Sequence, residues 1–156
     1  MHPVIRAYLR VFADEHGLKQ LGEAEQFERF VNHCVVAQFT SEQVDLERIT
    51  TSDADPSIDG IVTLLGDDVV YTAQEASDVL KALPARRSIS AHYVFVQAKR
   101  SDGFDAGEML KFGIGTKGLF DAGSRTNDDV AEEFVAIHQM LLESLNRIGE
   151  LPIHRG

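Results

Sequence analysis

Residues 90–98 form the most strand-like stretch of the chain, and the polar residues at its end limit what the chain can fold into. The stretch is apolar on both faces, which predicts a central strand covered on each side. Side chains alternate across a strand with a period of two, so Gln97 and Lys99 project from the same face. An amide and an ammonium are costly to bury without partners. The pattern therefore predicts a polar site where this strand ends.

A second apolar run, residues 58–65, carries an acid near its start and is predicted to form another strand. If the two strands are neighbours, the Asp59 carboxylate meets both the Gln97 amide and the Lys99 ammonium. A carboxylate, a neutral oxygen donor and a lysine at one strand end suit a hard divalent cation with a phosphate above it. The simpler interpretation is that Asp59 belongs to a turn and that Gln97 and Lys99 mark a solvated strand exit.

The hydrophobic periodicity of the chain predicts helices and strands in an α/β order. The helices are expected over residues 3–14, 23–38, 73–82, 104–120 and 127–148. The strands are expected over residues 44–50, 58–65, 69–71 and 90–98, with a further strand opening at 151–155. We therefore expect a mixed central sheet of four or five strands flanked by helices, in a single domain over residues 1–156.

The helix expected over residues 23–38 carries a second candidate acid. At about 100° per residue, Glu28 falls at the edge of its apolar stripe and Glu25 on the opposite side. Glu28 is thus expected to lean towards the sheet, and Glu25 to face solvent, although most carboxylates on a helix edge are simply solvated. The stripe itself is predicted to bury Ala24, Phe27, Val31, Cys34 and Val35.

Charge and cysteine content restrict the class of protein. The net charge of −10 argues against non-specific attraction to nucleic acid, so any such contact depends on a local basic site. The second half of the chain supplies the basic residues for one: Arg86, Arg87, Lys99, Arg100, Lys111 and Lys117. The single cysteine excludes an internal disulfide and fits a cytoplasmic protein. No apolar run reaches the length of a membrane span, so no membrane partner is expected.

The order of these motifs resembles that of the PD-(D/E)XK nuclease superfamily. Glu28 on a helix edge, Asp59 on a strand and the Gln97-Ala98-Lys99 run ending the next strand look like the three motifs of its Mrr-like, restriction-endonuclease branch. The sequence around them is closer still to the N-terminal nuclease region of AIPR abortive-infection phage-resistance proteins. The resemblance covers residues 22–120 and implies a restriction-endonuclease-like fold.

What this resemblance implies is phosphodiester hydrolysis that depends on Mg²⁺ or Mn²⁺, with DNA as the expected substrate and anti-phage defence as the expected role. Asp59, the Gln97 side-chain oxygen and the Ala98 carbonyl would hold the metal, with Glu28 closing the site. Lys99 would stabilise charge on the phosphorane-like transition state. Gln97 contributes no charge, so metal binding is expected to be weaker than with a glutamate at that position.

Further expectations concern partners and length. Arg100, or Lys111 one helix on, would hold the neighbouring phosphate of the nucleic acid. The strand-like run at 151–155 suggests that the chain is the N-terminal part of a longer protein, and the apolar seam of the 127–148 helix is a candidate homodimer surface. Two alternatives stay open. One is an inactive nuclease-like domain that binds nucleic acid or a partner protein, and the other is an assembly domain whose polar cluster only pins the sheet.

Overall fold

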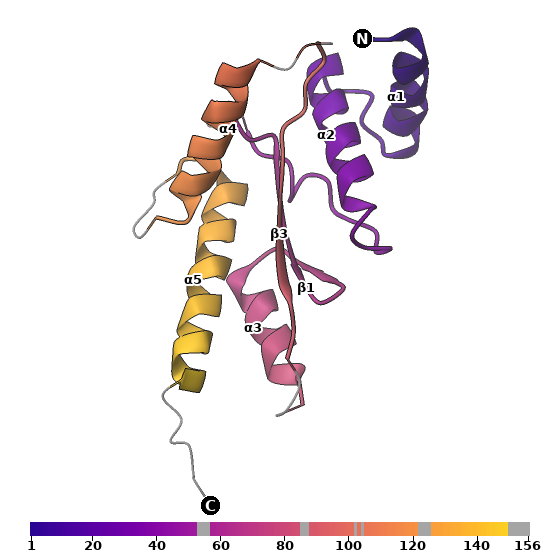
Figure 1. Ribbon diagram of the computed structural model, residues 1–156. Helices are drawn as coiled ribbons and strands as arrows, with labels where there is room; N and C mark the ends of the chain where they lie inside the picture. The colour runs from indigo at the N-terminus through magenta and orange to yellow at the C-terminus, as the bar shows by residue number, and fades with distance from the viewer. Residues whose placement is uncertain (53–56, 85–87, 102, 104, 122–125, 150–156) are drawn as a thin grey trace, which may run out of the picture.

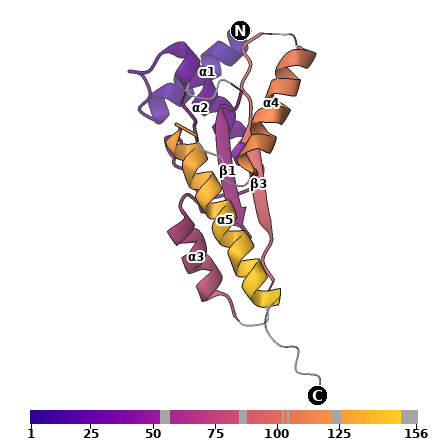
Figure 2. The ribbon, with the colours of Figure 1, turned by 90° about the vertical axis from the view of Figure 1, so that its left-hand side faces the viewer.

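The computed structural model places a small sheet between two groups of helices (Figure 1). It describes residues 1–52, 57–84, 88–101, 103, 105–121 and 126–149. Helices α1 (Pro3–Glu15) and α2 (Glu23–Val36) lie on one side of the sheet, and α3 (Ala73–Ala82), α4 (Ala106–Leu119) and α5 (Asp129–Gly149) lie on the other. Seen from the second side, α5 crosses in front of the two long strands (Figure 2). The α/β class expected from the sequence is confirmed.

The sheet is smaller than expected, with three antiparallel strands in the described part of the chain, in the order β2-β1-β3. Strand β1 (Gly60–Leu65) pairs with β2 (Asp68–Val70) across a tight turn and with β3 (Ala91–Val96) on its other edge. The prediction of a mixed sheet with four or five strands was therefore wrong. Residues 44–50 form bends and turns instead of an edge strand, and the run at 151–155 lies outside the described residues.

The central strand is β1 and not β3, contrary to expectation. All six residues of β1 are buried, whereas the first two residues of β3 are exposed. Strand β1 faces two cores, since Val62 and Leu64 pack among side chains of α1 and α2, while Ile61 and Leu65 pack beneath α5. An apolar pattern on both faces shows that a strand is covered, but it does not show how many neighbours the strand has.

Short local motifs account for one turn and two helix caps of the fold. Gly66 turns the chain from β1 into β2 with a φ of 63°, the left-handed conformation that suits glycine. The Thr72 hydroxyl accepts the Glu75 amide at 3.1 Å and caps α3. Asp128 caps α5, because its carboxylate accepts the Ala131 amide at 2.9 Å.

Helix α5 buries most of its apolar seam within the chain. Phe134, Ile137 and Leu141 are buried, whereas Leu145 is 64% exposed. The part of the seam that this structure leaves open to a second copy is therefore confined to the end of the helix. Among the described helices, none combines the length and apolarity needed to cross a membrane.

Candidate functional site

The start of β1 and the end of β3 lie side by side at one end of the sheet, because the strands are antiparallel and Gly60 pairs with Val96. Asp59 immediately precedes β1, and residues 97–99 immediately follow β3. Helices α2 and α4 stand on opposite sides of this end of the sheet (Figure 1). The structure thus brings Asp59 next to the segment that carries Gln97 and Lys99.

Three hydrogen bonds fix the position of Asp59, which is half-buried. Its amide donates to the Val96 carbonyl at 2.8 Å, which extends the ladder between the strands by one residue. Its carbonyl accepts from the Asn32 side-chain nitrogen of α2, also at 2.8 Å. Its carboxylate oxygen Oδ2 accepts the Ala98 amide at 2.6 Å. Asp59 is therefore an ordered acid of the sheet end and not a freely solvated turn residue.

Lys99 is oriented towards α4 by an acid that belongs to none of the three motifs. Its ammonium pairs with the carboxylate of Glu108, in the first turn of that helix. The Lys99 side chain is 23% exposed and that of Glu108 is 48% exposed, so the pair lies at the surface. The signal for it was present, because a carboxylate is favoured in the first turn of a helix and this helix follows Lys99 closely. Gln97 is half-buried.

The two acids of α2 occupy different environments. Glu28 is half-buried and lies four residues before Asn32, so the two share the helix face that meets Asp59. Glu25 is exposed, and its carboxylate accepts the Gly22 amide at 3.0 Å, which caps the start of the helix. Glu28 therefore shares a face of α2 with Asn32, and its part in the site stays a prediction.

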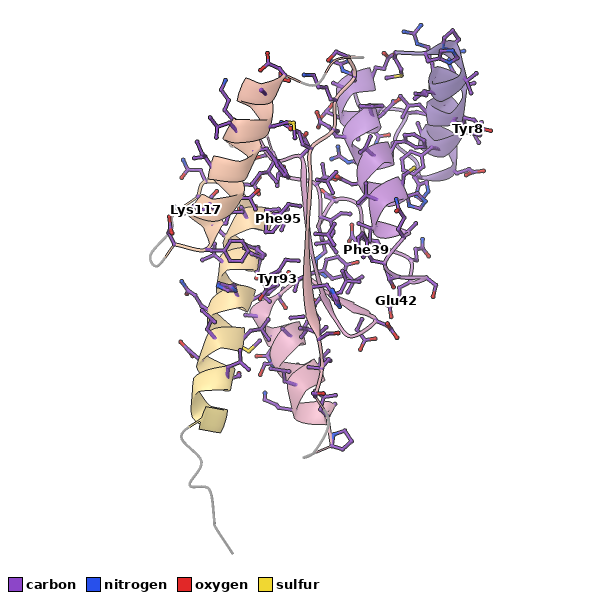
Figure 3. The ribbon with its side chains drawn as sticks, in the orientation of Figure 1. Tyr8, Phe39, Glu42, Tyr93, Phe95 and Lys117 are labelled. Atoms are coloured by element: carbon purple, nitrogen blue, oxygen red, sulfur yellow. The ribbon has the colours of Figure 1, made fainter. Side chains whose placement is uncertain are left out.

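The basic residues expected to contact nucleic acid lie at the surface around α4. Arg100 and Lys111 are exposed. Lys111 lies one turn after Glu108, on the same face of the helix. Lys117, further along the helix, points outward (Figure 3). Arg86 and Arg87 lie outside the described residues.

The donors at this end of the sheet determine which metal ion they would suit. Within the described part of the chain, no three histidine, cysteine or acidic side chains gather closely enough to hold a metal ion. A site here would combine the Asp59 carboxylate with neutral oxygens from Gln97 and Ala98. Mg²⁺ is usually bound through one or two carboxylates and completes its shell with water and substrate phosphates. With a single carboxylate, this donor set would hold Mg²⁺ only weakly and would need a substrate phosphate to complete the shell.

Sequence reasoning also missed Asn32, which is fully buried in the structure. Its side-chain nitrogen donates both to Asp59 and, at 3.0 Å, to the Thr50 hydroxyl. Its oxygen Oδ1 has no hydrogen-bond partner among the described residues. The available signal was its spacing, one helical turn after Glu28, which places a second polar residue on the same face.

Comparison of the chain with protein-family models, with curated proteins and with solved structures gave no match. The resemblance to the PD-(D/E)XK superfamily therefore depends on three short motifs. The arrangement of those motifs in space is the further observation that bears on what the chain does.

Proposed function

We propose that this chain is a Mg²⁺-dependent nuclease domain that hydrolyses phosphodiester bonds, with DNA as its substrate and anti-phage defence as its role. The observation that supports this most directly is the hydrogen bond from the Ala98 amide to the Asp59 carboxylate. It joins the acid of one motif to the middle residue of the next, so that the segment carrying Gln97 and Lys99 lies beside Asp59 at one end of the sheet. The substrate and the role come from the motif resemblance alone.

Each residue has a distinct part in the proposed chemistry. Asp59 would hold the cation together with the Gln97 side-chain oxygen and the Ala98 carbonyl, and Glu28 would contribute from α2. The bound cation would neutralise phosphate charge and lower the pKa of the attacking water. Lys99 would donate to a non-bridging phosphate oxygen, where negative charge increases in the transition state. Arg100 and Lys111 are exposed, so a long substrate can reach both side chains.

For Lys99 to reach a phosphate, it has to exchange its partner. Surface ion pairs of this kind stabilise a protein by about 0–1 kcal/mol, and both members of the Lys99–Glu108 pair are partly exposed. A metal-bound phosphodiester therefore needs little energy to displace the Glu108 carboxylate. The Lys99–Glu108 pair then serves as a resting arrangement that keeps the ammonium near the site.

Two features of the site favour a second function, that of a nuclease-like domain that binds nucleic acid without cutting it. Lys99 is engaged by Glu108, and no acidic cluster of three residues exists in the part of the chain that the structure describes. Such a domain would bind in a salt-dependent manner through Arg100, Lys111 and neighbouring basic groups. Metal-dependent cleavage distinguishes the two functions, because only the first includes it.

The assay is incubation of the 156-residue chain with single- and double-stranded DNA and RNA across a Mg²⁺ and Mn²⁺ titration. We expect cleavage of at least one substrate that rises with metal concentration and stops when EDTA is added. A chain that binds these nucleic acids but cuts none of them at any metal concentration is the binding domain and not the enzyme.

Glu28→Gln is expected to weaken Mn²⁺ binding about tenfold, the loss typical of removing a group that supports a metal ligand. Isothermal titration with Mn²⁺ measures the change in Kd. Glu25→Gln is the matched control, since it removes the same charge from the same helix at an exposed position. Equal losses for the two variants, or no loss for either, would remove Glu28 from the site.

A further inference from the structure

Asn32 connects α2 to the residue on which the candidate site depends. Its side chain is fully buried and donates to the Asp59 carbonyl at 2.8 Å. A carbonyl only accepts hydrogen bonds, so this contact fixes which end of the amide faces Asp59. The oxygen at the other end is left without a partner among the described residues, which is costly for a buried polar atom. If this side chain served packing alone, an apolar residue of the same size would make the protein more stable.

Strand β1 leaves room for the Asn32 side chain at Gly60. A Cβ atom added to Gly60 would lie 2.3 Å from Oδ1 of Asn32 and 2.7 Å from Nδ2. Real side chains do not tolerate such distances, so Asn32 occupies the space that any other residue at position 60 would need. Gly60 directly follows Asp59, and the absence of a side chain there lets the asparagine reach the Asp59 carbonyl.

The segment before β1 holds the same stretch from its other edge. The Ile61 amide donates to the Ile49 carbonyl at 2.9 Å, and the Thr51 hydroxyl donates to the Ile58 carbonyl. These contacts bracket Asp59 but none of them touches it. Asn32, by contrast, donates to the Asp59 carbonyl itself.

We infer that Asn32 is a positioning residue, which holds the Asp59 main chain so that the Asp59 carboxylate stays on the Ala98 amide. Because Glu28 lies one turn earlier on α2, Asn32 also sets the distance between the two acids of the site. The consequence for metal binding rests on the proposed function. The consequence for the hydrogen bond between Asp59 and Ala98 does not.

The test uses the Ala98 amide as a reporter, through hydrogen exchange measured by NMR. Asn32→Ala is expected to speed exchange at Ala98 about tenfold relative to the Gly66 amide, because a hydrogen bond of ordinary net strength is weakened. The Gly66 amide donates to the Ser90 carbonyl at 2.8 Å, at the opposite end of the sheet, and reports global stability. A purely structural role would accelerate exchange at both amides alike.

Two further variants separate packing from positioning. Asn32→Ala combined with Gly60→Ala refills part of the space and restores packing, but it does not restore the donor to Asp59. Exchange at Ala98 is therefore expected to stay fast in the double variant. Thr50→Val removes the other acceptor of the Asn32 nitrogen at 3.0 Å and leaves the bond to Asp59 intact, so exchange at Ala98 is expected to stay slow.

Mn²⁺ titration of the same variants tests the link to function. We expect the double variant to bind Mn²⁺ about 10- to 100-fold more weakly than the wild type, and Thr50→Val to bind it normally. The inference is overturned if Asn32→Ala speeds exchange equally at the Ala98 and Gly66 amides. It is also overturned if the Ala98 amide recovers its protection in the double variant. If the wild type binds no Mn²⁺ while exchange at Ala98 changes selectively, the positioning role stands and the proposed metal site fails.

Discussion

Lys99→Ala is expected to abolish nucleic-acid cleavage while leaving Mn²⁺ binding largely unchanged. The ammonium is proposed to act on the charge of the transition state, and removing one such group lowers a rate about a hundredfold or more. Asp59→Ala is expected to lose both cleavage and metal binding, because its carboxylate is the proposed charged ligand that lies beside residues 97–99. Cleavage rates and Mn²⁺ titrations on the same preparations measure the two effects.

The structure supplies a matched control for the lysine. Lys99→Ala also breaks the ion pair with Glu108, and Glu108→Gln breaks the same pair while keeping the ammonium. Glu108→Gln is therefore expected to cut at the wild-type rate or faster, since Lys99 no longer has to exchange partners. Loss of cleavage in both variants would assign the effect to the ion pair. Full activity in Lys99→Ala would place the activity elsewhere.

The meeting of the two motifs was predictable, because it needed only that the strands of residues 58–65 and 90–98 be neighbours. No residue in the sequence names the pairing partner of a strand. Two apolar strands with polar ends are nevertheless favoured as neighbours, because each then buries its apolar faces. The register that sets Asp59 beside Ala98 was not predictable in the same way. It follows from the pairing of Gly60 with Val96, which depends on how both faces of the sheet are filled.

The buried face of α2 shows why a polar member of the site escaped notice. An apolar stripe was expected to bury Cys34, yet Cys34 is exposed and Asn32 is buried. A stripe drawn from apolar residues cannot include an asparagine. Its burial is favourable only because Asp59 and Thr50 accept its amide hydrogens, and both acceptors come from distant segments of the chain.

The Lys99–Glu108 pair escaped prediction for a related reason. The partner expected for Lys99 was Asp59, on the neighbouring strand. The Asp59 carboxylate instead accepts a main-chain amide, and the lysine turns to the first turn of α4. Periodicity places side chains on faces, whereas the choice between two available acids depends on distances that only the folded chain fixes.

The largest loss of stability is expected from Phe134→Ala in α5. Phe134 is 1% exposed, and its ring meets those of Tyr93 and Phe95 edge-on, each at 5.2 Å between centroids. Both strand residues point from β3 towards α5 (Figure 3). The same ring packs against Phe120 at the end of α4. Phe134 thus joins two helices to the strand that leads into the candidate site.

Removing this ring leaves a cavity in the middle of the aromatic cluster and should lower the free energy of unfolding by about 3–5 kcal/mol. Urea denaturation followed by circular dichroism measures the loss. Phe39→Ala is the matched control, because Phe39 is 50% exposed and the same truncation there should cost within about 0.5 kcal/mol. Similar losses in the two variants would mean that α5 does not cover the sheet as described. A large loss confined to Phe134 would support the packing of α5 against Tyr93 and Phe95 of β3.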